Sequence, residues 1–175
     1  NKMKYKVLVA DDEYWSCENL RSLIAWEEYS LEFLAPASDG EELLERIPEE
    51  KPDIILTDIN MPFLDGLELL QRLQTQYPEI ITIAVSGYDD FEKVKGVFVS
   101  GGLDYILKPV GKEELVKILT KALGILEERE NARRNSENNL LQEHKLSSFM
   151  EDSEYSALLS GKLYGHFTTQ PHVSS

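Results

Sequence analysis

The chain has 175 residues, of which 42% are apolar, and a formal net charge of −14. Length and apolar content suit one globular domain with an extension, while the acidic balance argues against gripping the phosphates of nucleic acid, which requires clustered Lys and Arg. No apolar run approaches the roughly 20 residues that cross a bilayer, and no signal peptide precedes the first expected strand. The single cysteine, Cys17, cannot form an internal disulfide, which favours a reducing cytoplasm.

Short runs rich in Val, Ile and Leu alternate with amphipathic stretches along most of the chain. The expected strands are 5–10, 31–38, 53–58, 80–85 and 103–107. The expected helices are 13–26, 40–47, 65–76, 89–99 and one that begins near residue 111. This alternation predicts an α/β domain whose parallel sheet is covered by helices on both faces, with right-handed crossovers.

The pattern changes beyond the last expected helix. Residues 127–139 are polar and contain no Pro or Gly, so this helix is expected to continue. The predicted organisation is a domain over 4–126, a helical linker over 127–163 and a tail over 164–175. A coiled-coil spacing fits one set of apolar residues, namely Leu115, Leu119, Ala122, Leu126 and Leu140, but it is interrupted by Arg129, Arg133 and Ser136. A dimeric coiled coil and a single exposed helix both remain as interpretations.

Acidic side chains follow two of the expected strands. Asp11 and Asp12 come after the first strand, and Asp58 ends the third. Because the carboxyl ends of parallel strands meet at one edge, these carboxylates should converge and repel one another. A divalent cation would hold them together. We expect Mg²⁺ with Asp12 and Asp58 as direct ligands, the main-chain carbonyl of Asn60 as a third and Asp11 holding waters; an ordinary loop or helix cap is the alternative.

Polar residues also end the fourth and fifth strands. Lys108 could neutralise the acids or pair with a phosphoryl oxygen. The Ser86 hydroxyl could donate to the same phosphoryl group or simply begin a loop. Pro109 is expected to fix the turn that aims Lys108, with a cis peptide bond as one option. Tyr105 lies in the last strand, where a packing role is the simplest interpretation.

Five motifs occur in a fixed order: Val9–Glu13, Leu56–Pro62, Asp65–Gly66, Val85–Tyr88 and Asp104–Pro109. On these motifs, residues 4 to about 126 resemble the receiver domain of two-component response regulators. Resemblance and alternation together predict a doubly wound, five-stranded parallel sheet of order 2-1-3-4-5, flavodoxin-like, with a C-terminal helical extension.

The resemblance also implies roles for residues. Asp58 would be the phosphoacceptor and would take a phosphoryl group from a sensor histidine kinase. Asp12 and Asp58 would bind Mg²⁺, with Asp11 in support. Ser86 and Lys108 would contact the phosphoryl group.

Further positions match family residues that take part in conformational switching or that tune the lifetime of the phosphoryl group. Tyr105 matches the switch aromatic, which turns inward when the hydroxyl at residue 86 moves. Gly87 stands where the family more often has alanine. Asn60 and Tyr88 match the variable positions that tune phosphoryl lifetime. The switching surface would be the face made by the fourth helix, fifth strand and fifth helix.

Residues 86–92 and 108–110 resemble the subgroup whose receivers precede an AraC-like DNA-binding domain. No helix-turn-helix pattern follows, so that output domain is expected to be missing, either because the chain is part of a longer regulator or because the protein is naturally short. The expected partners are a histidine kinase and a second copy of the chain, bound through the switching surface or the extension. DNA would be bound only through the output domain, and no membrane contact is expected.

Two other classes of function fit parts of the pattern. A phosphorylation-independent interaction module would use the extension, but the complete set of acids, hydroxyl and lysine argues against it. A Mg²⁺-dependent phosphohydrolase of the best-known aspartate-nucleophile family needs an acid two residues after the nucleophile, where this chain has Asn60. We therefore expect no enzyme beyond slow self-dephosphorylation.

Overall fold

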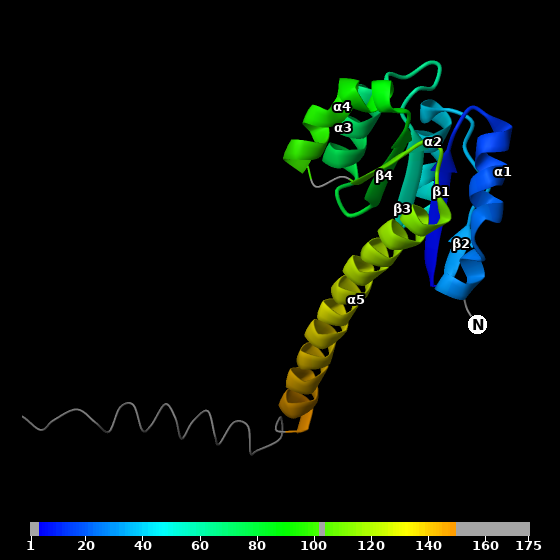
Figure 1. Ribbon diagram of the computed structural model, residues 1–175. Coiled ribbons are helices and arrows are strands. Elements are labelled where there is room, and N and C mark those ends of the chain that lie inside the picture. Colours follow the sequence, from blue (N-terminus) through cyan, green and yellow to red (C-terminus); the bar gives the residue numbers. More distant parts are fainter. Residues whose placement is uncertain (1–3, 102–103, 150–175) are drawn as a thin grey trace, which may run out of the picture. The chain divides into compact units, whose positions relative to one another are not determined.

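The computed structural model describes residues 4–101 and 104–149, with side chains described outside 97–101. Five strands form one parallel sheet in the order β2-β1-β3-β4-β5 (Figure 1). The strands are β1 Tyr5–Ala10, β2 Leu31–Phe33, β3 Ile54–Asp58, β4 Ile81–Ser86 and β5 Asp104–Leu107. The predicted doubly wound α/β fold and its strand order are confirmed.

Helices cover both faces of this sheet. They are α1 Tyr14–Leu23, the 3₁₀ helix η1 Trp26–Tyr29, α2 Gly40–Glu50, α3 Gly66–Gln76, α4 Tyr88–Gly101 and α5 Lys112–Phe149. On one face, Leu20 of α1 and Leu119 of α5 share a buried cluster with Val9 of β1. On the other face, α2, α3 and α4 cover the sheet through residues such as Leu43 and Leu70. The central strand β3 is therefore buried along its whole length.

The second strand is shorter than the expected 31–38. β2 ends at Phe33, and Pro36, which has no N–H to donate, lies in the segment that follows. Pairing resumes at Ala37, whose N–H donates to the Val9 carbonyl at 2.8 Å and which forms an isolated bridge with Ala10. The predicted strand thus combines a short strand and a separate bridge.

The first helix also ends earlier than the expected 13–26. α1 stops at Leu23, and the chain turns so that the indole N–H of Trp26 lies 3.2 Å and 3.0 Å from the carbonyl oxygens of Leu20 and Arg21. These are carbonyls at the end of a helix, which need donors from outside it. Trp26 therefore belongs to η1, and its buried ring is part of the apolar cluster that also contains Leu20 of α1.

The chain divides after Leu126 into two units, residues 1–126 and 127–175. In the first unit, α5 contributes buried apolar residues up to Leu126. In the second unit, the predicted helix is present as far as Phe149, and residues 131–146 are all exposed. The rest of the predicted linker, 150–163, and the predicted tail, 164–175, lie outside the described residues. Over the described part of the chain, no helix has both the length and the apolar character needed to cross a bilayer.

Candidate functional site

Three carboxylates meet where β1 and β3 end. Asp58 is the last residue of β3, and Asp11 and Asp12 directly follow β1, its neighbour in the sheet. One side-chain oxygen from each of the three lies within 4.8 Å of the other two. Asp11 and Asp58 are buried, whereas Asp12 is exposed. The site therefore has a buried floor and one side open to solvent.

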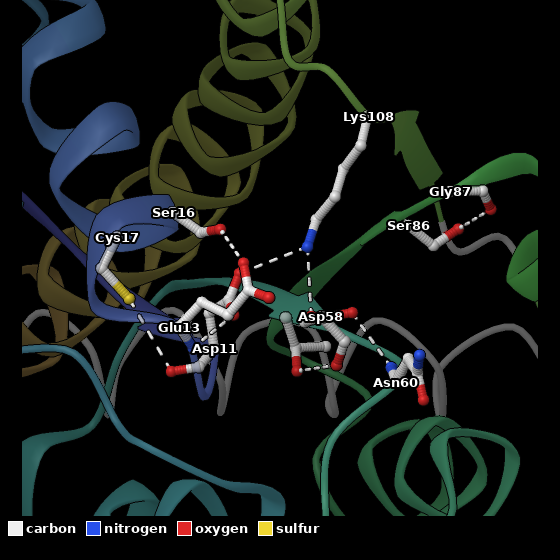
Figure 2. Close-up of polar contacts among 10 residues, drawn as sticks. Asp11, Glu13, Ser16, Cys17, Asp58, Asn60, Ser86, Gly87 and Lys108 are labelled. Atoms are coloured by element: carbon white, nitrogen blue, oxygen red, sulfur yellow. Dashed lines mark hydrogen bonds and ion pairs between the residues drawn. The ribbon is translucent and has the colours of Figure 1, made fainter.

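Backbone N–H groups hold the two buried carboxylates in place. One Asp58 oxygen accepts a hydrogen bond from the Asn60 N–H at 3.0 Å, and one Asp11 oxygen accepts from the Glu13 N–H at 2.9 Å (Figure 2). Each bond closes a tight turn from the carboxylate to the residue two positions on. In both residues the second oxygen is left to face the centre of the site.

Lys108, which follows β5, reaches those second oxygens. Its Nζ lies 3.1 Å from Asp58 Oδ2 and 3.4 Å from Asp11 Oδ2. Burial acts to lower the pKa of Lys108, but the neighbouring Asp58 and Asp11 carboxylates outweigh it and raise the pKa. Burial raises the pKa of Asp11, and the Glu13 N–H and Lys108 only partly oppose it. One ammonium thus bridges two carboxylates that would otherwise repel each other.

The turn after β5 is fixed to the end of β4. The Lys108 N–H donates to the Ser86 carbonyl at 2.8 Å, and the Lys108–Pro109 peptide bond is cis. This isomer was one option for the predicted turn. The Ser86 hydroxyl donates to the Gly87 carbonyl at 3.0 Å, so it points to its own loop and not to the carboxylates (Figure 2).

Tyr105 occupies the middle of β5 and points to the surface. The residue is 41% exposed, and its ring stacks on Phe91 of α4 with ring centroids 4.1 Å apart. The structure therefore places Tyr105 outward and against α4. Tyr88, one of the two positions predicted to tune phosphoryl lifetime, begins α4 and is 65% exposed.

An open hollow lies above the carboxylates. It is lined by Asp12, Glu13, Asp58, Asn60, Met61, Pro62, Gly87, Asp90 and Lys108. Glu13 and Asp90 were not predicted as part of the site. Asp90 lies in the first turn of α4, two residues past the last motif residue of that loop, so only the phase of the helix could have placed it here.

The donor set fits a hard divalent cation. All three side chains offer oxygen, and 4.8 Å is close to the roughly 4.2 Å between opposite ligands of one Mg²⁺. The exposed side at Asp12 leaves room for the waters that Mg²⁺ tends to keep.

Comparison with known proteins assigns the family. The profile of the response regulator receiver domain matches residues 7–120. The chain belongs to this family. Its acidic pocket of Asp11, Asp12 and Asp58 is the pocket of a receiver domain, which is not an enzyme in the usual sense.

Individual relatives agree with this placement. The REC domain of AraT, a response regulator from Geobacillus stearothermophilus, is 35% identical, with a TM-score of 0.67 over 72% of this chain and 98% of that one. A two-component transcriptional regulator AraC from Clostridium phytofermentans is 29% identical, with a TM-score of 0.64 over 69% of this chain and 94% of that one. The relatives thus include AraC-type two-component regulators, as the sequence resemblance implied.

One curated relative extends past the receiver. The uncharacterized transcriptional regulatory protein YesN of Bacillus subtilis is 29% identical over 157 residues, which are 90% of this chain and 43% of YesN. Residues beyond Leu126 are therefore part of the similarity. The chain spans about half the length or less of the curated relatives it matches.

Proposed function

We propose that this receiver accepts a phosphoryl group on Asp58 from a sensor histidine kinase and passes the event to an output domain outside this chain. The observation that carries the proposal is the bridge from Lys108 to Asp58 and Asp11, beside the exposed carboxylate of Asp12. A nucleophilic carboxylate, a cation that can follow a phosphoryl oxygen and an open approach are the parts that such a transfer needs.

In the transfer, the Asp58 oxygen that faces Lys108 attacks phosphorus in line with the leaving nitrogen of a phosphohistidine. The P–O bond forms as the P–N bond breaks, and the electron pair stays on the imidazole nitrogen, which takes up a proton. The Asn60 N–H holds the other Asp58 oxygen at 3.0 Å and so orients the nucleophile. Lys108 already contacts the attacking carboxylate, so it can move with the charge onto the phosphoryl group.

Mg²⁺ is the cation proposed for the three carboxylates, with Asp12, Asp58 and the Asn60 carbonyl as ligands and Asp11 holding waters. When bound, Mg²⁺ would supply charge neutralisation for the phosphoryl oxygens. Asn60, which lines the hollow, and Tyr88, at the start of α4, are proposed to set how long the phosphoryl group survives.

The switch begins at Ser86. A phosphoryl group adds roughly −1.5 to −2 charges and strong acceptor oxygens, which draw the Ser86 hydroxyl away from the Gly87 carbonyl and hold Lys108. Tyr105 then turns inward, and the surface made by α4, β5 and α5 changes shape. Such a change needs a two-state element that the new contacts bias.

Pairing of two copies is the proposed readout. The candidate surfaces are the α4–β5–α5 face and the second unit, where Leu140, Leu141, Leu146 and Phe149 are exposed. DNA contact belongs to the output domain, and the proposed location is the cytoplasm. Light scattering of the chain with and without phosphorylation tests the pairing. The mass of a single chain in both conditions would exclude it.

The phosphoacceptor is tested by intact mass spectrometry after incubation with a small-molecule phosphodonor, with and without Mg²⁺. The wild type should gain one phosphoryl group in the presence of Mg²⁺. Asp58→Ala should gain none. Asp90→Ala, which removes a carboxylate lining the same hollow, should be modified like the wild type.

The possible results separate the alternatives. An adduct that persists in Asp58→Ala would place the acceptor elsewhere. Absence of both an adduct and Mg²⁺ binding in the wild type would favour a phosphorylation-independent interaction module.

A further inference from the structure

We infer that Phe91 is a latch: its ring holds Tyr105 outward, and its backbone ties that ring to the loop that carries Ser86. The inference rests on the proposed function, because the latch would oppose the switch that phosphorylation of Asp58 drives. It adds a positioning residue that lies outside the five sequence motifs.

Ser86 and Tyr105 lie on the same face of the sheet. Val85 and Ile106 belong to the cluster under α1 and α5, whereas Ala84 belongs to the cluster under α3 and α4. Since side chains alternate along a strand, Ser86 and Tyr105 share the face of Ala84. Ala84 is also the direct neighbour of Tyr105 across the two strands. A movement of one side chain therefore reaches the other without crossing the sheet.

On this face the ring of Phe91 stacks on the ring of Tyr105. The two rings are nearly parallel, with 24° between their planes and 4.1 Å between their centroids. On this face Ala84 offers only a methyl group beside Tyr105. Turning inward separates the two rings, and this loss favours the outward position.

The backbone of Phe91 shares a hydrogen-bond acceptor with the Ser86 hydroxyl. The Gly87 carbonyl accepts two hydrogen bonds, one from the Ser86 hydroxyl and one from the Phe91 N–H, each at 3.0 Å. If the hydroxyl leaves to contact a phosphoryl group, this carbonyl keeps only the bond that begins α4. A Cβ added at Gly87 would meet nothing within 4 Å, so this point of the loop is not packed against other elements. A shift of the loop would carry Phe91 with it.

The latch therefore predicts a linkage between stacking and phosphoryl binding. If the outward state dominates, the apparent affinity for a phosphoryl analogue is reduced by the rarity of the inward state. Loss of an aromatic stack should raise the inward fraction, and so tighten binding, by roughly 2- to 13-fold. Phe91→Leu removes the stack and keeps apolar bulk, whereas Phe91→Tyr keeps it.

The test is a beryllofluoride titration in the presence of Mg²⁺, followed by ¹⁹F NMR of protein labelled with 3-fluorotyrosine. The chain has eight tyrosines, and Tyr105→Phe assigns the signal of interest. Phe63→Leu is the matched control, because it removes the same ring from a loop position that is 80% exposed.

Support requires two results. Phe91→Leu must bind beryllofluoride more tightly, and without the ligand its Tyr105 signal must move toward the bound position; Phe91→Tyr and Phe63→Leu must stay within twofold of the wild type. Unchanged or weaker binding by Phe91→Leu overturns the latch. Phe91→Met replaces the leucine variant if that variant does not fold.

The proposed function and the latch fail in different ways. If wild type and Asp58→Ala both show no beryllofluoride binding, the phosphoacceptor proposal fails. The latch is then judged from the ligand-free spectra alone: an unmoved Tyr105 signal in Phe91→Leu overturns it, and a moved signal retains the stack as the restraint on Tyr105.

Discussion

The ammonium of Lys108 lies 3.1 Å from one oxygen of Asp58, although the two residues are 50 positions apart in the sequence. The contact joins the ends of β3 and β5, which are separated in the sheet by β4. Lys108 therefore occupies the place beside Asp58 from which a cation can either neutralise the carboxylates or follow a transferred phosphoryl group.

Removing that ammonium should destabilise the domain in the absence of Mg²⁺. Lys108→Met leaves Asp58 and Asp11 facing each other without a counter-charge, and both are buried. We expect a loss of about 1–2 kcal/mol, less than for a fully buried pair, because the Lys108 side chain is 32% exposed. Mg²⁺ should stabilise the variant more than the wild type, because no ammonium competes for the carboxylates. Urea unfolding at neutral pH, with and without Mg²⁺, measures both effects.

Lys95→Met is the control for this change. Lys95 pairs with Glu92 at 2.8 Å, but both side chains are well exposed, so its removal should cost less than about 0.5 kcal/mol. Equal losses in the two variants would mean that the Lys108 bridge contributes no more than a surface ion pair.

Asp53, which lies outside the carboxylate site, should make the stability of the folded domain depend on pH. Burial raises its pKa above the ordinary 3.8, against the opposing effect of the Lys6 N–H. The folded chain thus binds this proton more tightly, so the associated stability is present below pH 3.8 and is lost as pH rises through the folded pKa. As the pH rises through the folded pKa of Asp53, Asp53→Asn should therefore gain stability relative to the wild type. Urea midpoints from pH 3.5 to 7 test it; a constant difference would contradict it.

The sequence was sufficient for elements whose signal is local. β3 is buried on both faces, so its apolar run alone marks a central strand. The end of α1 was wrong because Trp26, which looks like the next apolar position of the same helix, donates its indole N–H back to that helix. β2 was too long because an apolar run shows neither where Pro36 interrupts the pairing nor that Ala37 restores it.

The features of the site likewise fall into those that the sequence predicted and those that it did not. Asp11, Asp58 and Lys108 were placed together because each ends or follows a parallel strand, and strand ends meet at one edge. The inclusion of Asp90 depends on the phase of α4. The orientation of the Ser86 hydroxyl and the stack of Phe91 on Tyr105 depend on side-chain rotamers. These features are set by packing between elements, which no local pattern reports.

The boundary near Leu126 can be tested by truncation. A chain that ends at Ala132 keeps every buried apolar position of α5, so its stability should stay within about 0.5 kcal/mol of the longer chain. A chain that ends at Lys121 loses the buried Ala122 and Leu126 and should lose about 3 kcal/mol or more. Urea unfolding of both compares them directly. A large loss in the longer truncation would show that residues beyond 132 support the receiver core.

Gly66 and Gly87 both lie near the site, but an added Cβ would meet backbone at Gly66 and open space at Gly87. A Cβ at Gly66 would lie 2.2 Å from the Ile59 carbonyl oxygen, which is backbone and has no side-chain freedom. Gly66→Ala must therefore displace either the start of α3 or the loop that follows Asp58, and we expect a loss of about 2–4 kcal/mol in urea unfolding. Because Asn60 is the next residue in that loop, Mg²⁺ binding should weaken as well.

Gly87→Ala is the matched change, since no atom lies within 4 Å of its Cβ. Its stability should stay within about 0.5 kcal/mol of the wild type or rise by up to about 1 kcal/mol, because alanine restricts the unfolded chain. Comparable losses in both variants would mean that the helix start, and not the approach to Ile59, requires glycine. A loss confined to Gly66→Ala, together with weaker Mg²⁺ binding, would link the Asp65–Gly66 motif to the position of the metal-binding loop.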